Sequence, residues 1–152
     1  MSIPASPVPP LRLLVGYDGS PPASRALDAA ISLLRGRTGH IDLVYVAHLT
    51  STVMMSAGAV AEMEEDFTEI EQELRAAAAE QLHGHDLSWG FVRREGQIAD
   101  ELIEVAKAIG LAHPGDTVVI VVGSSSNAMH RMVGSAAVAL ARHSPVPLVI
   151  VP

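Results

Sequence analysis

The chain alternates short apolar runs with longer stretches whose apolar residues recur every three or four positions. This alternation limits its possible folds more than any other feature. The apolar runs are strand-sized and lie at 11–17, 40–47, 87–94, 117–122 and 147–151. Strands that alternate with helices join through right-handed crossovers into a parallel sheet covered by helices on both faces. The sequence therefore predicts one α/β domain over residues 11–152, with residues 1–10 as a flexible, proline-rich lead-in.

Capping residues predict where the helices begin and end. Ser20 is suited to the N-cap, and Pro21 to the first helical position, where an N–H group is not needed. The longest helix should end at Gly84. One face of that helix carries the apolar residues Val60, Met63, Phe67, Ile70, Leu74, Ala77 and Gln81/Leu82. The other face is acidic in its first half, which we interpret as a solvated surface and not as a metal site.

Charge and composition exclude several classes of function. The net charge is −7 and Lys107 is the only lysine, so there is no basic stripe for nucleic acid. No apolar run is long enough to span a membrane, and the start of the chain does not resemble a signal peptide. Without a targeting segment or a cysteine, the expected location is the cytoplasm. A Walker loop, a Gly-x-Ser-x-Gly elbow and a thiol nucleophile are all absent.

Small and polar residues follow the first and fourth predicted strands, where open parallel sheets bind their ligands. Asp18 follows the first strand, and Gly123-Ser124 follows the fourth. Gly134-Ser135 lies at or near a helix start, where free N–H groups favour anions. Spacing alone leaves two readings open, because Gly19-Ser20 and Gly134-Ser135 are also ordinary turn and cap residues. Arg131 could reach a phosphate or could be solvated, and His83-Gly84-His85 lacks a third metal ligand nearby.

Five segments together resemble the universal stress protein family. The first segment resembles the family's opening, in which a strand ends in Asp-Gly-Ser, and the last two resemble its C-terminal signature. They are 15–20 (VGYDGS), 43–46 (LVYV), 95–98 (EGQI), 122–135 with its Gly123-Ser124 and Gly134-Ser135 pairs, and 145–152 (PVPLVIVP). The resemblance extends over almost the whole chain after residue 10.

The resemblance implies an open, five-stranded parallel sheet of order 3-2-1-4-5, with the first and fourth strands adjacent. It also implies a site for ATP or a related adenine nucleotide, with Mg²⁺ as a possible companion of ATP. In nucleotide-binding members, the residue matching Asp18 contacts adenine or ribose, and the backbone near Val46 contacts adenine. Residues matching Gly123, Gly134 and Ser135 hold the ribose and phosphates.

The phosphate loop departs from the family pattern, which is Gly, two residues, Gly, nine residues and then Gly-Ser or Gly-Thr. Here Ser126 replaces the second glycine, and only seven residues separate it from Gly134. Glycine permits φ values that serine rarely adopts. The hydroxyls of Ser124 and Ser126 could supply hydrogen bonds in its place. These two residues complete the predicted nucleotide site.

The resemblance further implies a homodimer, in which the last strand pairs antiparallel with its copy. That strand comprises Leu148, Val149, Ile150 and Val151. The expected function is that of a non-enzymatic stress-response protein, a dimeric sensor or adaptor that binds an adenine nucleotide and an unidentified protein partner. A nucleotide-free dimeric adaptor is one alternative. A slow ATPase is another, less favoured because only His130 could titrate near the phosphates, and we assign no catalytic residue.

Overall fold

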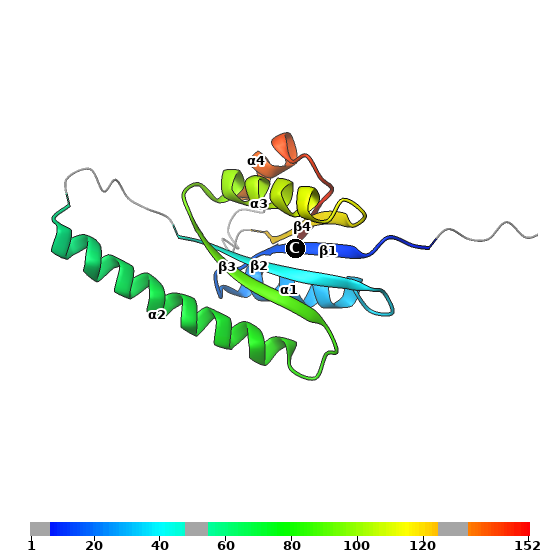
Figure 1. Ribbon diagram of the computed structural model, residues 1–152, viewed down its shortest axis with the longest axis horizontal. Coiled ribbons are helices and arrows are strands. Elements are labelled where there is room, and N and C mark those ends of the chain that lie inside the picture. The colour runs from blue at the N-terminus through cyan, green and yellow to red at the C-terminus, as the bar shows by residue number, and fades with distance from the viewer. Residues whose placement is uncertain (1–6, 48–54, 125–133) are drawn as a thin grey trace, which may run out of the picture.

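The computed structural model describes residues 7–47, 55–124 and 134–152. Within them, five parallel strands form one sheet of order β3-β2-β1-β4-β5, flanked by helices (Figure 1). In chain order the elements are β1 (Leu11–Gly16), α1 (Pro21–Leu33), β2 (Gly39–Ala47), α2 (Ala57–Leu82), β3 (Ser88–Glu95), α3 (Ile98–Ala112), β4 (Thr117–Gly123), α4 (Ser135–His143) and β5 (Leu148–Val151). The predicted fold class and strand order are confirmed.

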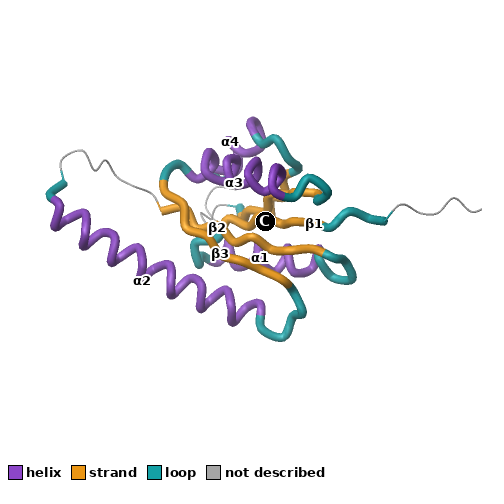
Figure 2. Tube along the Cα trace, in the orientation of Figure 1, coloured by secondary structure: helices purple, strands orange, loops and turns teal. Residues whose placement is uncertain are grey.

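The helices form a layer on each face of the sheet, as Figure 2 shows. Alternate residues of β1 point to opposite faces. Leu13 and Val15 pack in a cluster with α1 and the last turns of α2. Leu14 packs in a second cluster with α3 and α4. All three side chains are fully buried, so β1 forms the centre of the core.

The predicted helix ends are found in the structure. The Ser20 hydroxyl accepts a hydrogen bond from the Ala23 N–H at 3.3 Å, and Pro21 is the first helical residue of α1. Gly84 follows the C-cap of α2 with a φ of 81°, in the left-handed region that glycine readily adopts. No part of 7–47, 55–124 or 134–152 forms a helix long and apolar enough to cross a bilayer.

Helix α2 is less buried than its apolar periodicity predicts. It begins at Ala57, where the Ser56 hydroxyl accepts a hydrogen bond from the Ala59 N–H at 3.2 Å. Its buried residues are Ala78 and Leu82, at its C-terminal end. A helix of 26 residues is about 39 Å long, whereas the eight residues of β3 span about 26 Å. The first turns of α2 therefore project past the sheet (Figure 1).

A polar network lies on the sheet at the opposite end from the predicted nucleotide site. Arg12 on β1 donates to Asp42 on β2 at 3.2 Å. His40 lies 2.7 Å from the Ser88 hydroxyl through Nδ1 and 3.4 Å from Asp42 through Nε2. Burial lowers the pKa of His40 below its ordinary value of 6.5; the Asp42 carboxylate acts in the opposite direction, and the Arg12 charge adds to the lowering.

This lowered pKa predicts a pH dependence of stability. As the pH falls below about 6.5, the unfolded chain takes up a proton at His40 before the folded chain does. The free energy of unfolding should therefore fall between pH 6.5 and the lower folded pKa. A His40→Gln variant should lose this part of the pH dependence, as urea unfolding at several pH values would reveal. Parallel curves for the two proteins would contradict the prediction.

Candidate functional site

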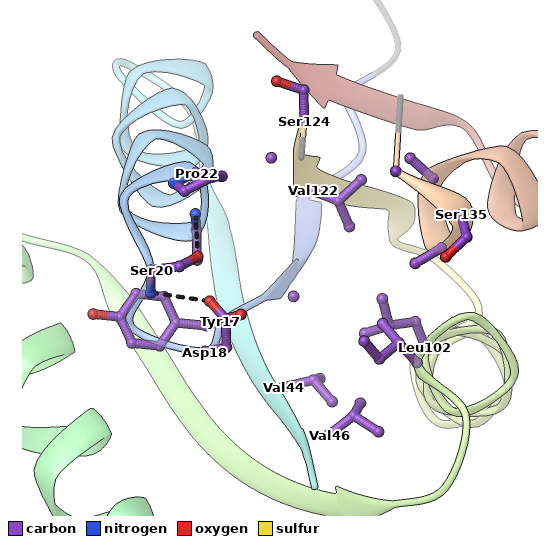
Figure 3. Close-up of a pocket in the computed structure, with 17 residues that line it drawn as sticks. Tyr17, Asp18, Ser20, Pro22, Val44, Val46, Leu102, Val122, Ser124 and Ser135 are labelled. Carbon is purple, nitrogen blue, oxygen red and sulfur yellow. Dashed lines mark hydrogen bonds between the residues drawn. The ribbon is translucent and has the colours of Figure 1, made fainter. Parts of the chain in front are cut away.

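The candidate site lies where β1 and β4 pair side by side at the centre of the sheet, with Val15 opposite Val121. After β1 the chain enters α1 on one face, and after β4 it continues to α4 on the other. This reversal opens a crevice beyond the carboxyl ends of the strands. The cleft found there has a volume of about 370 Å³ (Figure 3).

Six of the seven residues predicted for the site line this one cleft. They come from four parts of the chain that are distant in the sequence: Asp18, Val46, Gly123, Ser124, Gly134 and Ser135. The seventh, Ser126, lies outside the described residues, together with His130 and Arg131. The structure thus brings the described members of the predicted set together. Their part in binding stays a prediction.

The turn from β1 into α1 positions Asp18. The Ser20 N–H donates to Asp18 Oδ1 at 3.0 Å, and Gly19 allows the turn with a φ of 75°. Ser20 also caps α1, so Gly19 and Ser20 form the turn and the cap at the start of this helix. Asp18 itself is exposed. No donor in the described parts of the chain reaches its other carboxylate oxygen, which can therefore accept from a ligand.

Tyr17 is buried beside Asp18 and anchors the turn to β2. Its N–H donates to the Val44 carbonyl at 2.9 Å, and its side chain is 4% exposed. Burial raises the pKa of the Tyr17 phenol above its ordinary value of 10.0, and the charge of Asp18 adds to the effect. The phenol is therefore neutral at physiological pH. Asp18 is the only charged side chain among the described lining residues.

The N-terminus of α4 forms the other side of the cleft. Gly134 is the N-cap, and no side chain caps the helix there. Ser135 is the first helical residue, so the cap position of the Gly134-Ser135 pair belongs to Gly134. Gly134 has φ −56° and ψ 156°, which other residues also adopt, so its backbone does not demand glycine. The first N–H groups of α4 have no partner within the helix and lie beside the cleft.

Gly123 has a packing role as well as a place in the cleft. A Cβ atom built there would collide with the Pro22 carbonyl in the first turn of α1. The end of β4 therefore approaches α1 so closely that only glycine fits. This close approach brings Ser124 to the rim of the cleft, where its N–H donates to the Val151 carbonyl at 2.7 Å.

Four branched aliphatic residues of the cleft were not among the predicted site residues. Val44 lies on the same face of β2 as Val46, and the two-residue period of a strand could have identified it. Val122 similarly ends the apolar run of β4. Ile98 and Leu102 come from α3, and only the path of that helix across the sheet places them in the cleft. Among the described residues, no group of three or more metal-ligating side chains is arranged around a common point.

Comparison with known proteins identifies the family. The model of the universal stress protein family matches residues 11–152. The chain therefore belongs to the universal stress protein family. No curated protein matches it. A structure of the hypothetical protein MJ0577, used as a test of function assignment, covers 95% of this chain and 96% of its own, with 18% identity and a TM-score of 0.76.

Two further solved structures contain nucleotides. A universal stress protein in complex with cAMP is 23% identical, with a TM-score of 0.60, and the match covers 93% of this chain and 97% of that one. A universal stress protein family protein from Arabidopsis thaliana with AMP bound is 15% identical, with a TM-score of 0.64. That match covers 93% of this chain and 91% of the Arabidopsis chain. These likenesses show the common fold.

Proposed function

We propose that the protein binds an adenine nucleotide in the cleft beyond β1 and β4. One observation carries this proposal. The free carboxylate oxygen of Asp18 and the uncapped N-terminus of α4 face the same crevice from opposite sides, as Asp18 and Ser135 do in Figure 3. A carboxylate accepts hydrogen bonds from ribose hydroxyls, whereas helix N–H groups bind phosphate. The two ends of a nucleotide thus have matching partners.

The walls between these two ends suit a purine base. Val44, Val46 and Leu102 give the cleft an apolar side, and their side chains are grouped in Figure 3. Pockets for small ligands combine such apolar walls with a few polar groups that fix orientation. The complexes of family members with cAMP and with AMP support the same ligand class.

The proposal also concerns how many phosphates the bound nucleotide carries. No cation among the described lining residues offsets the charge of a triphosphate. We therefore expect AMP to bind without help, and ATP to rely more on Mg²⁺. Asp18, the one carboxylate among the described lining residues, is assigned here to the ribose end of the nucleotide, so we propose a binding protein in preference to an ATPase. In this proposal the protein is a cytoplasmic sensor or adaptor of the stress response.

Calorimetric titration with AMP tests the proposal. The protein should bind AMP saturably, and Asp18→Asn should weaken binding about tenfold, the loss expected for a charged hydrogen-bond acceptor. Asparagine keeps an oxygen for the Ser20 N–H, so the turn should be preserved. Asp86→Asn, at an exposed position near the opposite end of the sheet, is the matched control. A flat titration of the folded wild-type protein would refute nucleotide binding and favour the nucleotide-free adaptor.

The proposal includes a homodimer that pairs through β5. The Pro147 and Val151 carbonyls accept hydrogen bonds from the β4 side, at 3.0 and 2.7 Å. Because peptide groups alternate along a strand, those of Leu148 and Ile150 face the open edge of the sheet. An unpaired edge of this kind is a template for a second strand. The last strand is therefore a self-complementary surface for a two-fold dimer.

Proline at position 150 should abolish this pairing. Ile150→Pro removes one edge N–H but leaves the described hydrogen bonds between β4 and β5 intact. Light scattering should show a dimer for the wild type and a monomer for this variant. Ile150→Ala, which keeps the N–H, should remain dimeric. A wild-type monomer at micromolar concentration would contradict the dimer.

A further inference from the structure

The first half of α2 carries an apolar stripe that the described parts of the chain bury only in part. The stripe consists of Val60, Met63, Phe67 and Ile70, spaced by three and four residues along one side of the helix. Val60 is 37% exposed and Ile70 is 38% exposed. Met55, just before the helix, is 38% exposed. The stripe begins on the part of α2 that projects past the sheet (Figure 1).

A charged side chain of β3, that of Arg93, contacts this half of α2. The Arg93 guanidinium lies over the Phe67 ring, 5.9 Å from its centre. The same guanidinium binds Glu64 at 3.0 Å and approaches Glu71 at 4.0 Å. Arg93 thus neutralises the acidic residues on one flank of the stripe and fixes the helix against β3. Closer to the N-terminus, Val60 stays exposed.

The other flank of the stripe keeps its negative charge. Helical spacing places Asp66 and Glu73 next to Ile70. Three further acidic residues continue this flank around the helix: Glu62, Glu65 and Glu69. None of these five residues forms an ion pair within the described parts of the chain. An uncovered apolar stripe with an unneutralised acidic flank is complementary to a surface that is apolar and basic.

We propose that this face of α2, from Met55 to Leu74, docks a basic amphipathic helix of another protein. Leucine-like side chains of that helix would cover Val60 and Ile70, and its lysines or arginines would pair with the acidic flank. A second copy of the chain does not fit, because two α2 faces would bring acidic flanks together in a protein of net charge −7. An anionic membrane surface is disfavoured for the same reason. This inference goes beyond nucleotide binding and does not depend on it.

A designed peptide provides the test. The probe is a fluorescein-labelled helical peptide of 18 residues, with leucine at helical spacing and lysine elsewhere. Its binding to the full chain is measured by fluorescence anisotropy at physiological salt. We expect saturable binding with one peptide per chain. A Val60→Ser/Ile70→Ser variant should bind at least tenfold more weakly. So should Asp66→Asn/Glu73→Gln, which removes charge while preserving side-chain shape.

Two controls make the result specific. Val138 on α4 is 40% exposed, about as much as Val60 and Ile70. The Val138→Ser variant should therefore bind the peptide like the wild type. A peptide with glutamate in place of lysine should not bind. The proposal is overturned if only the charge variants lose binding, since the attraction would then be non-specific. It is also overturned if Val60→Ser/Ile70→Ser converts a dimer to a monomer in light scattering, since a second copy would then be the occupant. Thermal unfolding should show that each variant is folded.

Discussion

Replacing Ala136 with glutamate should abolish most of the affinity for AMP. Ala136 is the second residue of α4 and lines the cleft beside the first N–H groups of that helix. A carboxylate there would occupy the position proposed for the phosphate and would repel it. We expect the dissociation constant of AMP in calorimetry to rise ten- to a hundredfold, about 1.4 to 2.8 kcal/mol. The fold should be unharmed, because an acidic residue in the first turn stabilises a helix.

Ala136→Gln is the matched control, because it adds the same bulk without the charge. If the phosphate lies at α4, Ala136→Gln should bind AMP more tightly than Ala136→Glu, and adenosine should not distinguish the two variants. An equal loss of AMP binding in both variants would mean that bulk is the cause. Wild-type affinity in Ala136→Glu would place the phosphate elsewhere. Val138→Glu, away from the cleft on the same helix, should bind normally.

Among the glycines that line this cleft, replacement of Gly123 by alanine should destabilise the fold most. The new Cβ would collide with the Pro22 carbonyl, which belongs to the backbone and cannot turn aside as a side chain can. Overpacking of this kind costs about 1–3 kcal/mol. In a protein of this size, each kcal/mol lowers the melting temperature by about 2–4 °C. Urea unfolding and thermal scans without ligand would measure both quantities.

Gly115→Ala is the control for this stability prediction. A Cβ at Gly115 would meet no atom within 4 Å, so the substitution should change the free energy of unfolding little. If Gly123→Ala is as stable as Gly115→Ala, then β4 and α1 do not approach each other as closely as described. Glycine at position 123 would then be explained by the ligand alone.

Local chemistry made the element boundaries predictable from the sequence. Ser20 and Pro21 determine the start of α1 through one hydroxyl and one missing N–H. Gly84 ends α2 because it alone adopts a positive φ there without strain. The order of the strands is not local. The alternation of elements predicts a parallel sheet, but it was the resemblance to a family that placed the first and fourth strands side by side.

The candidate site was predictable at the strand ends and not elsewhere. Asp18 and Gly123 follow strands directly, and the rule for open parallel sheets places such residues at the site. Leu102 could not be found in this way, because it lies a full turn into α3 and reaches the cleft only through the packing of that helix. The role of Ser135 was also open, since the sequence does not tell an N-cap from the first helical residue. The projection of α2 had no sequence signal, because its apolar period continues unchanged from Val60 to Leu82.

The position of β1 at the centre of the sheet has a consequence for how the chain folds. Strand β1 is the first of the five to be synthesised, but one of its two neighbours, β4, comes late in the sequence. In that pairing Leu11 lies opposite Thr117. Until β4 has emerged from the ribosome, β1 can pair only with β2 and leaves an apolar edge open. Contacts so distant in sequence close slowly, and an open edge of this kind is prone to aggregate. The strand at the centre of the core therefore keeps one edge unpaired until most of the domain has been synthesised.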